Sequence, residues 1–207
     1  MLVLASSSPR REELLRNAAI NFVVQATNIA EDPLPDEGPR ALAERLAKEK
    51  AAAVSAERRF DYILGADTVV VIDDQILGKP RDGADAARML RLLSGCSHQV
   101  ITGVCLSGPL PAAENPEAPP IGWFEDIRSE TTHVTMAEIA EKDIDFYVST
   151  GEPMDKAGAY AIQGIASRWV VRIEGDYTNV VGLPVPLVHR MLLSHKILRS
   201  NGTVERG

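Results

Sequence analysis

The chain is poor in cysteine, which argues against a disulfide framework or a cysteine-based metal site. Only two cysteines, Cys96 and Cys105, occur among the 207 residues. They form no pair with the spacing of metal ligands, and they neighbour a segment that reads as a strand. We therefore expect two buried thiols rather than a disulfide.

Long apolar runs, a basic leader and an excess of positive charge are also missing. No apolar run is long enough to span a membrane, and Met1–Ala5 lacks the basic segment of a signal peptide. The formal net charge of −7 argues against broad binding to nucleic acid or membranes. We expect a cytoplasmic protein with neither partner, in which a polyanionic substrate needs a local basic site.

Glycine-rich phosphate loops of the Walker and Rossmann types are absent as well. In their place, Ser6–Arg11 follows a short apolar strand and opens a helix, with Ser8 suited to the N-cap and Pro9 to the first helical position. A helix start favours anions, and the forks of Arg10 and Arg11 match phosphate oxygens. The alternative is a capped helix with two solvated arginines.

Strand and helix signals alternate along the chain, and hydrophobic residues make up 45% of it. The pattern predicts an α/β fold with a mixed, twisted sheet flanked by helices. We expect one domain over residues 1–197 and a polar tail over 198–207. Prolines between residues 107 and 126 predict a long exposed loop, and Asp73-Asp74 predicts a hairpin turn. The expected strands are 2–5, 21–25, 62–73, 98–107, 123–138 and 167–174, and the expected helices are 9–18, 37–58, 82–93, 141–150 and 184–197.

Asp67 stands in the middle of the apolar strand 62–73. An isolated carboxylate there is costly unless it is paired or binds a metal. This favours a functional aspartate over a structural one.

Two lysines stand out by position. Lys50 continues a four-residue apolar spacing along the helix 37–58, so it lies on the buried stripe, whereas Lys48 points away. Lys50 can alternatively extend its ammonium to the solvent past its apolar stem. Lys79 precedes Pro80, which favours extended backbone, and on its own it reads as a surface lysine.

Three further features remain open. His98 begins a strand without a nucleophile motif nearby, which favours a structural role over that of a general base. The charged segment 151–158 can form a local ion network or reach a ligand. Gln163 has an amide with both a donor and an acceptor, which suits the imide edge of uracil or thymine.

Together these segments resemble the Maf family of nucleoside triphosphate pyrophosphatases, in family order from residue 2 to about residue 190. The matching motifs are Ser6-Ser7-Ser8-Pro9-Arg10-Arg11, Gly65-Ala66-Asp67-Thr68, Gly78-Lys79-Pro80, His98-Gln99-Val100-Ile101-Thr102-Gly103-Val104, Gly151-Glu152-Pro153-Met154-Asp155-Lys156-Ala157-Gly158-Ala159-Tyr160, Ile162-Gln163-Gly164 and Asn179-Val180-Val181-Gly182-Leu183-Pro184.

The resemblance implies a fold like that of inosine triphosphatases, with two lobes around a cleft, and a homodimer. It implies hydrolysis of dTTP and UTP to the monophosphate and pyrophosphate with Mg²⁺ or Mn²⁺. The implied catalytic residues are Asp67, Glu31, Lys50 and Lys79, of which Glu31 and Asp67 hold the metal. The implied substrate-binding residues are Ser6, Arg10, Arg11, Thr68 and Gln163.

The chain departs from the family pattern at two positions. Ala30 stands where many relatives carry an acidic residue, and Ala161 stands where a glycine is common. Two alternatives to the dTTP/UTP activity remain: a nucleotide-binding regulator of cell division without catalysis, and the same reaction on a modified nucleotide such as methylated guanosine triphosphate.

Overall fold

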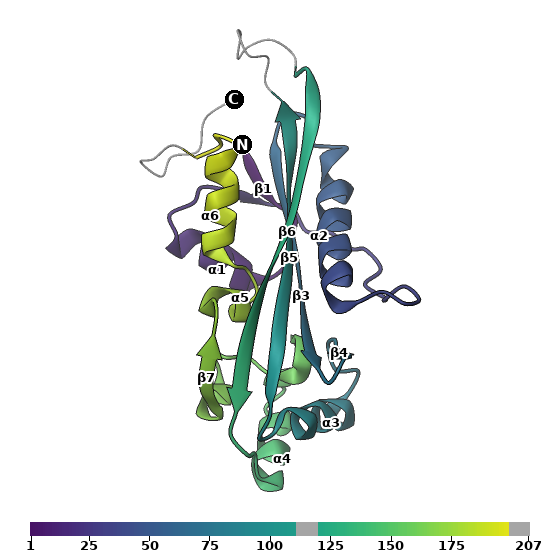
Figure 1. The fold of residues 1–207 in the computed structure, drawn as a ribbon, viewed down its shortest axis with the longest axis vertical. Helices are drawn as coiled ribbons and strands as arrows, with labels where there is room; N and C mark the ends of the chain where they lie inside the picture. The colour runs from purple at the N-terminus through teal and green to yellow at the C-terminus, as the bar shows by residue number, and fades with distance from the viewer. Residues whose placement is uncertain (111–119, 199–207) are drawn as a thin grey trace. The chain divides into compact units, whose positions relative to one another are not determined.

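The computed structural model describes residues 1–110 and 120–198. Among these residues, seven strands form one mixed sheet in the order β2-β1-β3-β5-β6-β7, with β4 paired to β3 (Figure 1). The pairs β1–β2 and β1–β3 are parallel, and β3–β4 and β6–β7 are antiparallel. The predicted α/β fold with a mixed sheet flanked by helices is confirmed. No helix in the described ranges is both long and apolar enough to cross a membrane.

The elements follow the predicted order, with several short additions. The strands are β1 (Leu2–Leu4), β2 (Val23–Val24), β3 (Tyr62–Ile72), β4 (Gln75–Leu77), β5 (Ser97–Leu110), β6 (Gly122–Met136) and β7 (Val170–Glu174). The α-helices are α1 (Pro9–Asn17), α2 (Pro39–Ser55), α3 (Gly83–Leu93), α4 (Glu141–Ser149), α5 (Tyr177–Val181) and α6 (Val185–Ser194). The 3₁₀ helices are η1 (Glu152–Asp155), η2 (Ala157–Ala159) and η3 (Ile165–Arg168). The sequence pattern predicted neither α5 nor the 3₁₀ helices, because each is only three to five residues long.

The predicted loop over residues 107–126 is wrong at both ends. β5 continues through Pro109 to Leu110, β6 begins at Gly122, and the Ile121 N–H donates to the Leu110 carbonyl at 3.0 Å. A proline removes only one donor, and the pairing of β5 with β6 extends both strands despite that loss. Residues 111–119 of this loop, and residues 199–207 of the predicted tail, lie outside the described residues.

The chain divides into two compact units. The first comprises Met1–Asp67, Thr102–Ser129 and the chain from Gly182, and the second comprises Thr68–Ile101 and Glu130–Val181.

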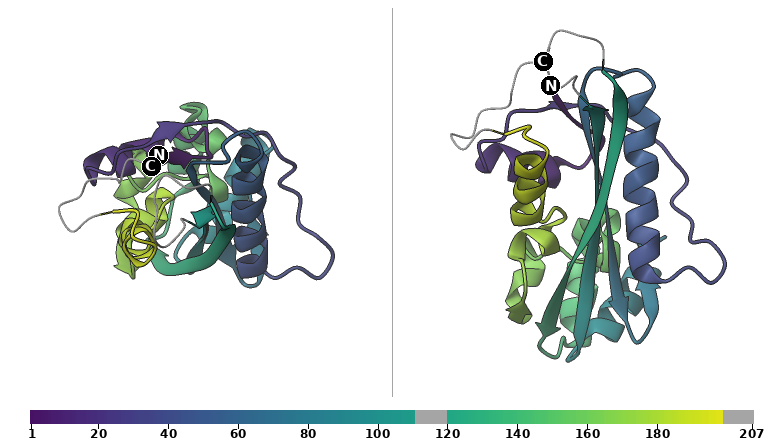
Figure 2. Two further views of the ribbon diagram at one scale, coloured as in Figure 1. Left: turned by 90° about the horizontal axis from the view of Figure 1, so that it is seen from above. Right: turned by 45° about the horizontal axis from the view of Figure 1, so that its top comes forward.

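In the first unit, α2 packs on one face of the strands, and α1 and α6 lie on the other face (Figures 1 and 2). Two glycines let the α2 backbone come close. A Cβ on Gly65 would lie 2.1 Å from the Ala47 carbonyl oxygen, and one on Gly103 would lie 2.2 Å from that of Ala43. The buried cluster between the helix and the strands consists of Val3, Ala5, Ala47, Ala51, Val54, Ile63 and Cys105.

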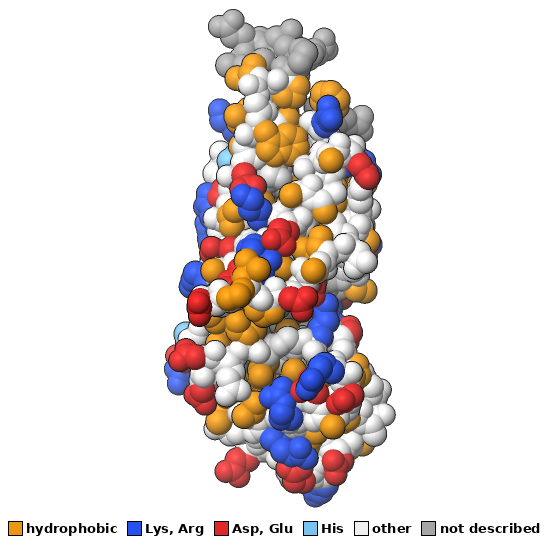
Figure 3. All heavy atoms as spheres, turned by 90° about the vertical axis from the view of Figure 1, so that its right-hand side faces the viewer, with side chains coloured by type: hydrophobic (Ala, Val, Ile, Leu, Met, Phe, Trp, Pro, Cys, Tyr) orange, Lys and Arg blue, Asp and Glu red, His pale blue; other side chains and the backbone are white. Residues whose placement is uncertain are grey.

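The outer face of α2 carries paired charges of both signs. Arg45 contacts Glu37 and Glu49, and Lys48 contacts Glu125 at 2.7 Å. Figure 3 shows blue and red side chains intermixed on the face to which α2 contributes. This agrees with the expectation that Lys48 points away from the buried stripe, and it leaves α2 with a surface of mixed charge.

In the second unit, α3 packs against α4 and η2. Asp82 caps α3 by accepting a hydrogen bond from the Asp85 N–H at 2.8 Å. Asp73 and Asp74 both have positive φ, at 45° and 63°, between β3 and β4. This is the geometry of a tight hairpin turn, so the predicted turn is confirmed.

The two cysteines differ from each other. Cys105 is buried as predicted, and burial raises the pKa of its thiol to about 12. The prediction of a buried thiol is wrong for Cys96, which is exposed between α3 and β5. Its position just outside both elements leaves it beyond their buried faces.

We expect Gly65→Ala to lower the free energy of unfolding by about 3 kcal/mol, because the added methyl group collides with backbone atoms of α2 rather than with a flexible side chain. Urea unfolding measures this loss. The matched control is Gly78→Ala, where nothing lies within 4 Å of the added atom, and it should change stability by less than about 0.5 kcal/mol. Equal effects of the two substitutions would contradict the close approach of α2.

Candidate active site

The sequence-predicted site residues fall into two groups, one in each unit. The first unit holds Ser6, Arg10, Arg11, Glu31, Lys50 and Asp67, and the second holds Thr68, Lys79 and Gln163. Each group is described in its own unit.

Lys50 lies on the buried stripe of α2, as predicted, and is only 8% exposed. Its ammonium does not extend to the solvent. Instead, Nζ donates to Oε1 of Glu31 and to Oδ1 of Asp67, each at 2.6 Å. The structure thus brings together three of the predicted residues around a single nitrogen atom.

Asp67 lies inside β3 and is 7% exposed, so its charge depends on a partner. Lys50 supplies that partner from α2. Glu31 belongs to the loop after β2, and its side chain is 40% exposed. The group therefore has a buried carboxylate at one end and a carboxylate open to the solvent at the other, joined by a cation.

Arg11 is a second buried cation in this unit, at 8% exposure. Its Nε donates to the Gly182 carbonyl at 2.7 Å, and its Nη1 donates to the Ala66 carbonyl at 2.8 Å and to Ser6 Oγ at 3.2 Å. Burial lowers the pKa of Arg11, and the charges of Asp67 and Glu31 oppose that shift. Arg11 therefore joins the start of α1 to the residue before Asp67 and to the segment before α6.

The helix start has two interpretations: an anion site, and a capped helix with two solvated arginines. The contacts of Arg11 test only the second. The alternative of two solvated arginines is wrong for Arg11, whereas Arg10 is half-buried. Ser8 takes the N-cap position and Pro9 the first helical position, as predicted, but the Ser8 side chain makes no capping bond. The Ser8 N–H donates to Ser6 Oγ instead, at 3.2 Å. A phosphate contact by Ser6, Arg10 or Arg11 stays a prediction.

In the second unit, Lys79 is exposed just after β4, and Thr68 is half-buried in β3. The loop of Lys79 is fixed through its neighbour, since the Gly158 N–H donates to the Gly78 carbonyl at 3.1 Å. Gly158 has a φ of 69°, and a Cβ there would lie 2.9 Å from Val70. A glycine is therefore required at this contact.

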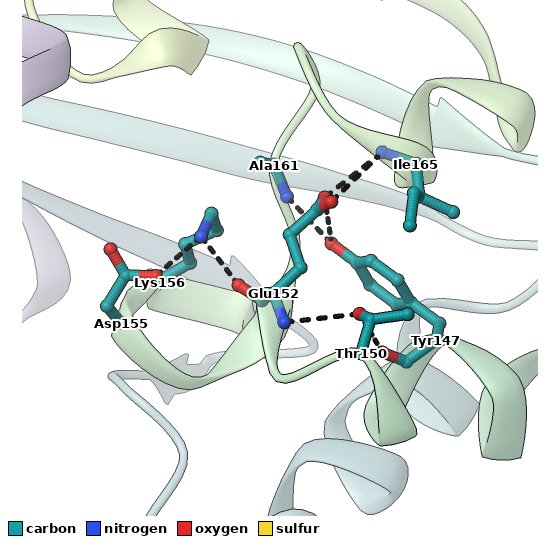
Figure 4. A network of polar contacts seen from close by, with 7 residues as sticks. All are labelled: Tyr147, Thr150, Glu152, Asp155, Lys156, Ala161 and Ile165. Carbon is teal, nitrogen blue, oxygen red and sulfur yellow. Dashed lines mark hydrogen bonds and ion pairs between the residues drawn. The ribbon is translucent and has the colours of Figure 1, made fainter.

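The charged segment after α4 forms a local network, as one of the two interpretations predicted (Figure 4). Lys156 pairs with Asp155 and also donates to the Glu152 carbonyl. The Glu152 carboxylate accepts from the Tyr147 hydroxyl at 2.9 Å and from the Ile165 N–H at 3.1 Å. Gly151 has a φ of 74° after α4, which confirms its predicted place beyond the helix end.

Gln163 is exposed on a turn, and its amide makes no hydrogen bond within the part of the chain that the structure describes. The turn spans residues 161–164, and the Gly164 N–H donates to the Ala161 carbonyl at 3.0 Å. The residues that hold this turn, Tyr147 above all, could not be recognised in this role from the sequence. The only available signal was the apolar spacing of Ile144 and Tyr147 along α4, which is typical of ordinary core residues.

His98 is buried in the second unit and contacts Tyr160. Its Nε2 lies 2.8 Å from the Tyr160 hydroxyl oxygen, and the two rings meet edge to face. Burial lowers the pKa of His98 to about 4. An imidazole that stays neutral inside the protein fits the structural role that its position favoured.

We expect Arg11→Lys to lower the free energy of unfolding by about 3 kcal/mol, because buried carbonyls of Ala66 and Gly182 lose a donor that lysine cannot replace at both. Arg10→Lys, at the adjacent half-buried position, is the matched control and should cost less than about 1 kcal/mol. Urea unfolding compares the two variants. Equal losses would show that Arg11 does not join these segments.

We expect His98 to make the protein less stable as the pH falls from 6.5 toward 4. In this interval the unfolded imidazole binds a proton and the folded one does not, so the unfolded state gains up to about 3 kcal/mol. Urea unfolding at several pH values should therefore show a weaker acid loss for His98→Gln than for the wild type. His189→Gln, at an exposed position, should follow the wild type. A parallel fall for His98→Gln would contradict the lowered pKa.

Comparisons with known proteins cover almost the whole chain. A family model described as "Maf-like protein" matches residues 1–195. A dTTP/UTP pyrophosphatase of Koribacter versatilis is 53% identical over 191 residues, which cover 92% of each chain. A protein of the same name from Symbiobacterium thermophilum is 49% identical over 191 residues, again with 92% of each chain covered.

A solved structure, a nucleoside-triphosphatase or dITP/XTP pyrophosphatase from Mycobacterium abscessus, is 16% identical with a TM-score of 0.38. The match covers 67% of this chain and 75% of that one. At this TM-score the likeness carries no argument, so the inosine-triphosphatase-like arrangement of two lobes around a cleft stays a prediction. The family match and the high identity to curated relatives do not depend on it, and they show that this chain belongs to the family of Maf-like proteins.

Proposed function

We propose that this chain hydrolyses dTTP and UTP to the nucleoside monophosphate and pyrophosphate. The observation that carries the proposal is the contact of Lys50 with both Glu31 and Asp67 at 2.6 Å. It gathers two carboxylates and a cation, the groups that phosphoryl chemistry needs, in one place. The names of relatives that are about half identical to this chain support the same activity.

Glu31 and Asp67 fit a divalent cation. Each presents an oxygen 2.6 Å from Lys50 Nζ, so the two carboxylates are held close together. No group of three or more His, Cys, Asp or Glu side chains that could hold a metal occurs among the described residues. Mg²⁺ commonly binds through one or two carboxylates together with substrate phosphates, so two carboxylates suffice. Mg²⁺, or Mn²⁺ in its place, supplies Lewis-acid polarisation of the phosphate oxygens when it is bound.

In the proposed reaction, Asp67 takes a proton from the water that attacks the α-phosphorus. A new P–O bond forms to the water oxygen, the bond from the α-phosphorus to the bridging oxygen breaks, and pyrophosphate leaves. Lys50 keeps the two carboxylates together and offsets negative charge at the phosphates. Arg11 holds the backbone of Ala66 and so fixes the base of the Asp67 side chain.

The other residues receive roles within their own units. In the first unit, Ser6, Arg10, Arg11 and the N–H groups at the start of α1 bind phosphate oxygens. In the second unit, Lys79 offsets the charge of the leaving pyrophosphate, and Gln163 pairs with the imide edge of uracil or thymine. Thr68, Arg10 and Gln163 match the three residues that are typical of the dTTP/UTP branch of the family.

We further propose a cytoplasmic homodimer that binds no nucleic acid. The net charge of −7 and the mixed charges on α2 support the last point. The dimer rests on the resemblance alone, and the location rests on the sequence composition.

We expect Asp67→Asn to release pyrophosphate from UTP at least about 100-fold more slowly than the wild type, because the proton acceptor is lost. The matched control is Asp74→Asn in the exposed hairpin turn, which should keep full turnover. Binding of a non-hydrolysable UTP analogue and the thermal midpoint show whether Asp67→Asn still folds and binds. Full turnover by a folded Asp67→Asn protein would sink its assignment as the base.

The substrate and metal are tested on the wild type with a panel of nucleoside triphosphates, in Mg²⁺ and in EDTA. The proposal requires metal-dependent release of pyrophosphate from dTTP and UTP. Turnover of methylated guanosine triphosphate instead would overturn the assigned base, and tight binding without turnover of any member would favour the regulator.

A further inference from the structure

The turn at residues 161–164 presents Gln163 at the surface of the second unit. It is closed by the hydrogen bond from the Gly164 N–H to the Ala161 carbonyl. A single bond across four residues leaves the direction of such a turn undetermined. What holds the turn therefore decides where the Gln163 amide points.

Tyr147 holds the residue at which the turn begins (Figure 4). The Ala161 N–H donates to the Tyr147 hydroxyl oxygen at 3.2 Å, and the same hydroxyl donates to Glu152 Oε1 at 2.9 Å. Tyr147 is fully buried on α4, and its ring packs edge to face on Trp169 at 5.4 Å between centroids. Burial raises the pKa of Tyr147, so the hydroxyl keeps the proton that it donates.

Glu152 holds the residue that follows the turn. The Ile165 N–H donates to Oε1 at 3.1 Å and to Oε2 at 3.4 Å. The carboxylate also fills the space beside Gly164, where a Cβ would lie 2.0 Å from Oε1. Gly164 has a φ of −101°, which any residue adopts, so the close carboxylate alone accounts for a glycine here.

Glu152 is itself fixed at its backbone. Its N–H donates to Thr150 Oγ1 at 3.2 Å, and its carbonyl accepts from Lys156. The chain of contacts therefore runs from a buried tyrosine on α4 through one carboxylate to both sides of the turn. Such a network fixes a backbone segment more firmly than any of its single bonds.

We propose that Tyr147 and Glu152 are positioning residues for base selectivity, which hold the turn so that the Gln163 amide meets the imide edge of uracil or thymine. The inference rests on the proposed function, in which Gln163 contacts the base. In this proposal both residues act through the turn and not through a contact with the substrate. Their effect therefore belongs to the recognition of the base and leaves the chemistry at the triphosphate unchanged.

The test compares kcat and KM for pyrophosphate release from UTP, CTP and ATP in Tyr147→Phe, which removes only the hydroxyl. We expect the KM for UTP to rise about tenfold and the preference for UTP to fall by a similar factor, which corresponds to one lost hydrogen bond. The value of kcat should stay within about threefold of the wild type, a change of less than 1 kcal/mol. Tyr177→Phe, at an exposed position of the same unit, is the matched control and should change neither value.

A second pair of variants keeps the test decisive if loss of the hydroxyl disturbs folding. Glu152→Ala removes the acceptor for Tyr147 and Ile165, whereas the amide oxygen of Glu152→Gln can still accept from both. We expect the alanine variant to lose selectivity and the glutamine variant to keep most of it. Hydrogen exchange at Ala161 and Ile165 should be faster in Tyr147→Phe and in Glu152→Ala.

Three outcomes overturn the inference. If folded Tyr147→Phe and Glu152→Ala lower the turnover of every triphosphate by the same factor, the two residues are merely structural. If both keep the UTP preference while Gln163→Ala loses it, the positioning role fails and the proposed contact of Gln163 with the base stands. If Gln163→Ala itself keeps the preference, the assigned contact with the base fails, and the positioning role fails with it.

Discussion

The contact between Lys50 and Asp67 is the constraint on which the first unit depends. A lysine and an aspartate, each less than a tenth exposed, are tolerable inside a protein only as partners. Their meeting requires α2 to lie very close to β3. Gly65 provides this, because it stands two residues before Asp67 on the same face of the strand, against Ala47 and Ala51 on either side of Lys50.

Arg11 adds a second buried cation to the same unit but serves a different purpose. Lys50 binds side-chain carboxylates, whereas Nε and Nη1 of Arg11 donate hydrogen bonds to backbone carbonyls and to Ser6. The planar fork of a guanidinium can reach several acceptors in fixed directions, which a single ammonium cannot do. The two cations thus have different roles: Lys50 pairs with the Asp67 carboxylate, and Arg11 fixes the backbone next to Asp67. An acidic chain can in this way keep two buried cations at one place.

Some functional residues could be predicted from the sequence because their charge contrasts with the apolar residues around them. Lys50 was visible because a charge interrupts an apolar stripe, and Asp67 because a carboxylate interrupts an apolar strand. The order and type of the longer elements were equally predictable from their periodicity. The buried position of Arg11 could not be predicted. Its acceptors are the backbone carbonyls of Ala66 and Gly182, which are 55 and 171 residues away in the sequence. Every residue has such a carbonyl, so the sequence does not mark these two as partners. The full lengths of β5 and β6 could not be predicted either, since strand pairing outweighs the local effect of proline.

The same physical device recurs in both units: a missing Cβ lets another group occupy its space. At Gly65 the occupant is the backbone of α2, and at Gly164 it is the carboxylate of Glu152. In each case the glycine has no chemistry of its own, yet it decides how close a polar or charged group comes to a backbone. Functional side chains can therefore be identified from a single sequence more readily than their places in the structure. Those places depend in part on glycines, which lack a Cβ.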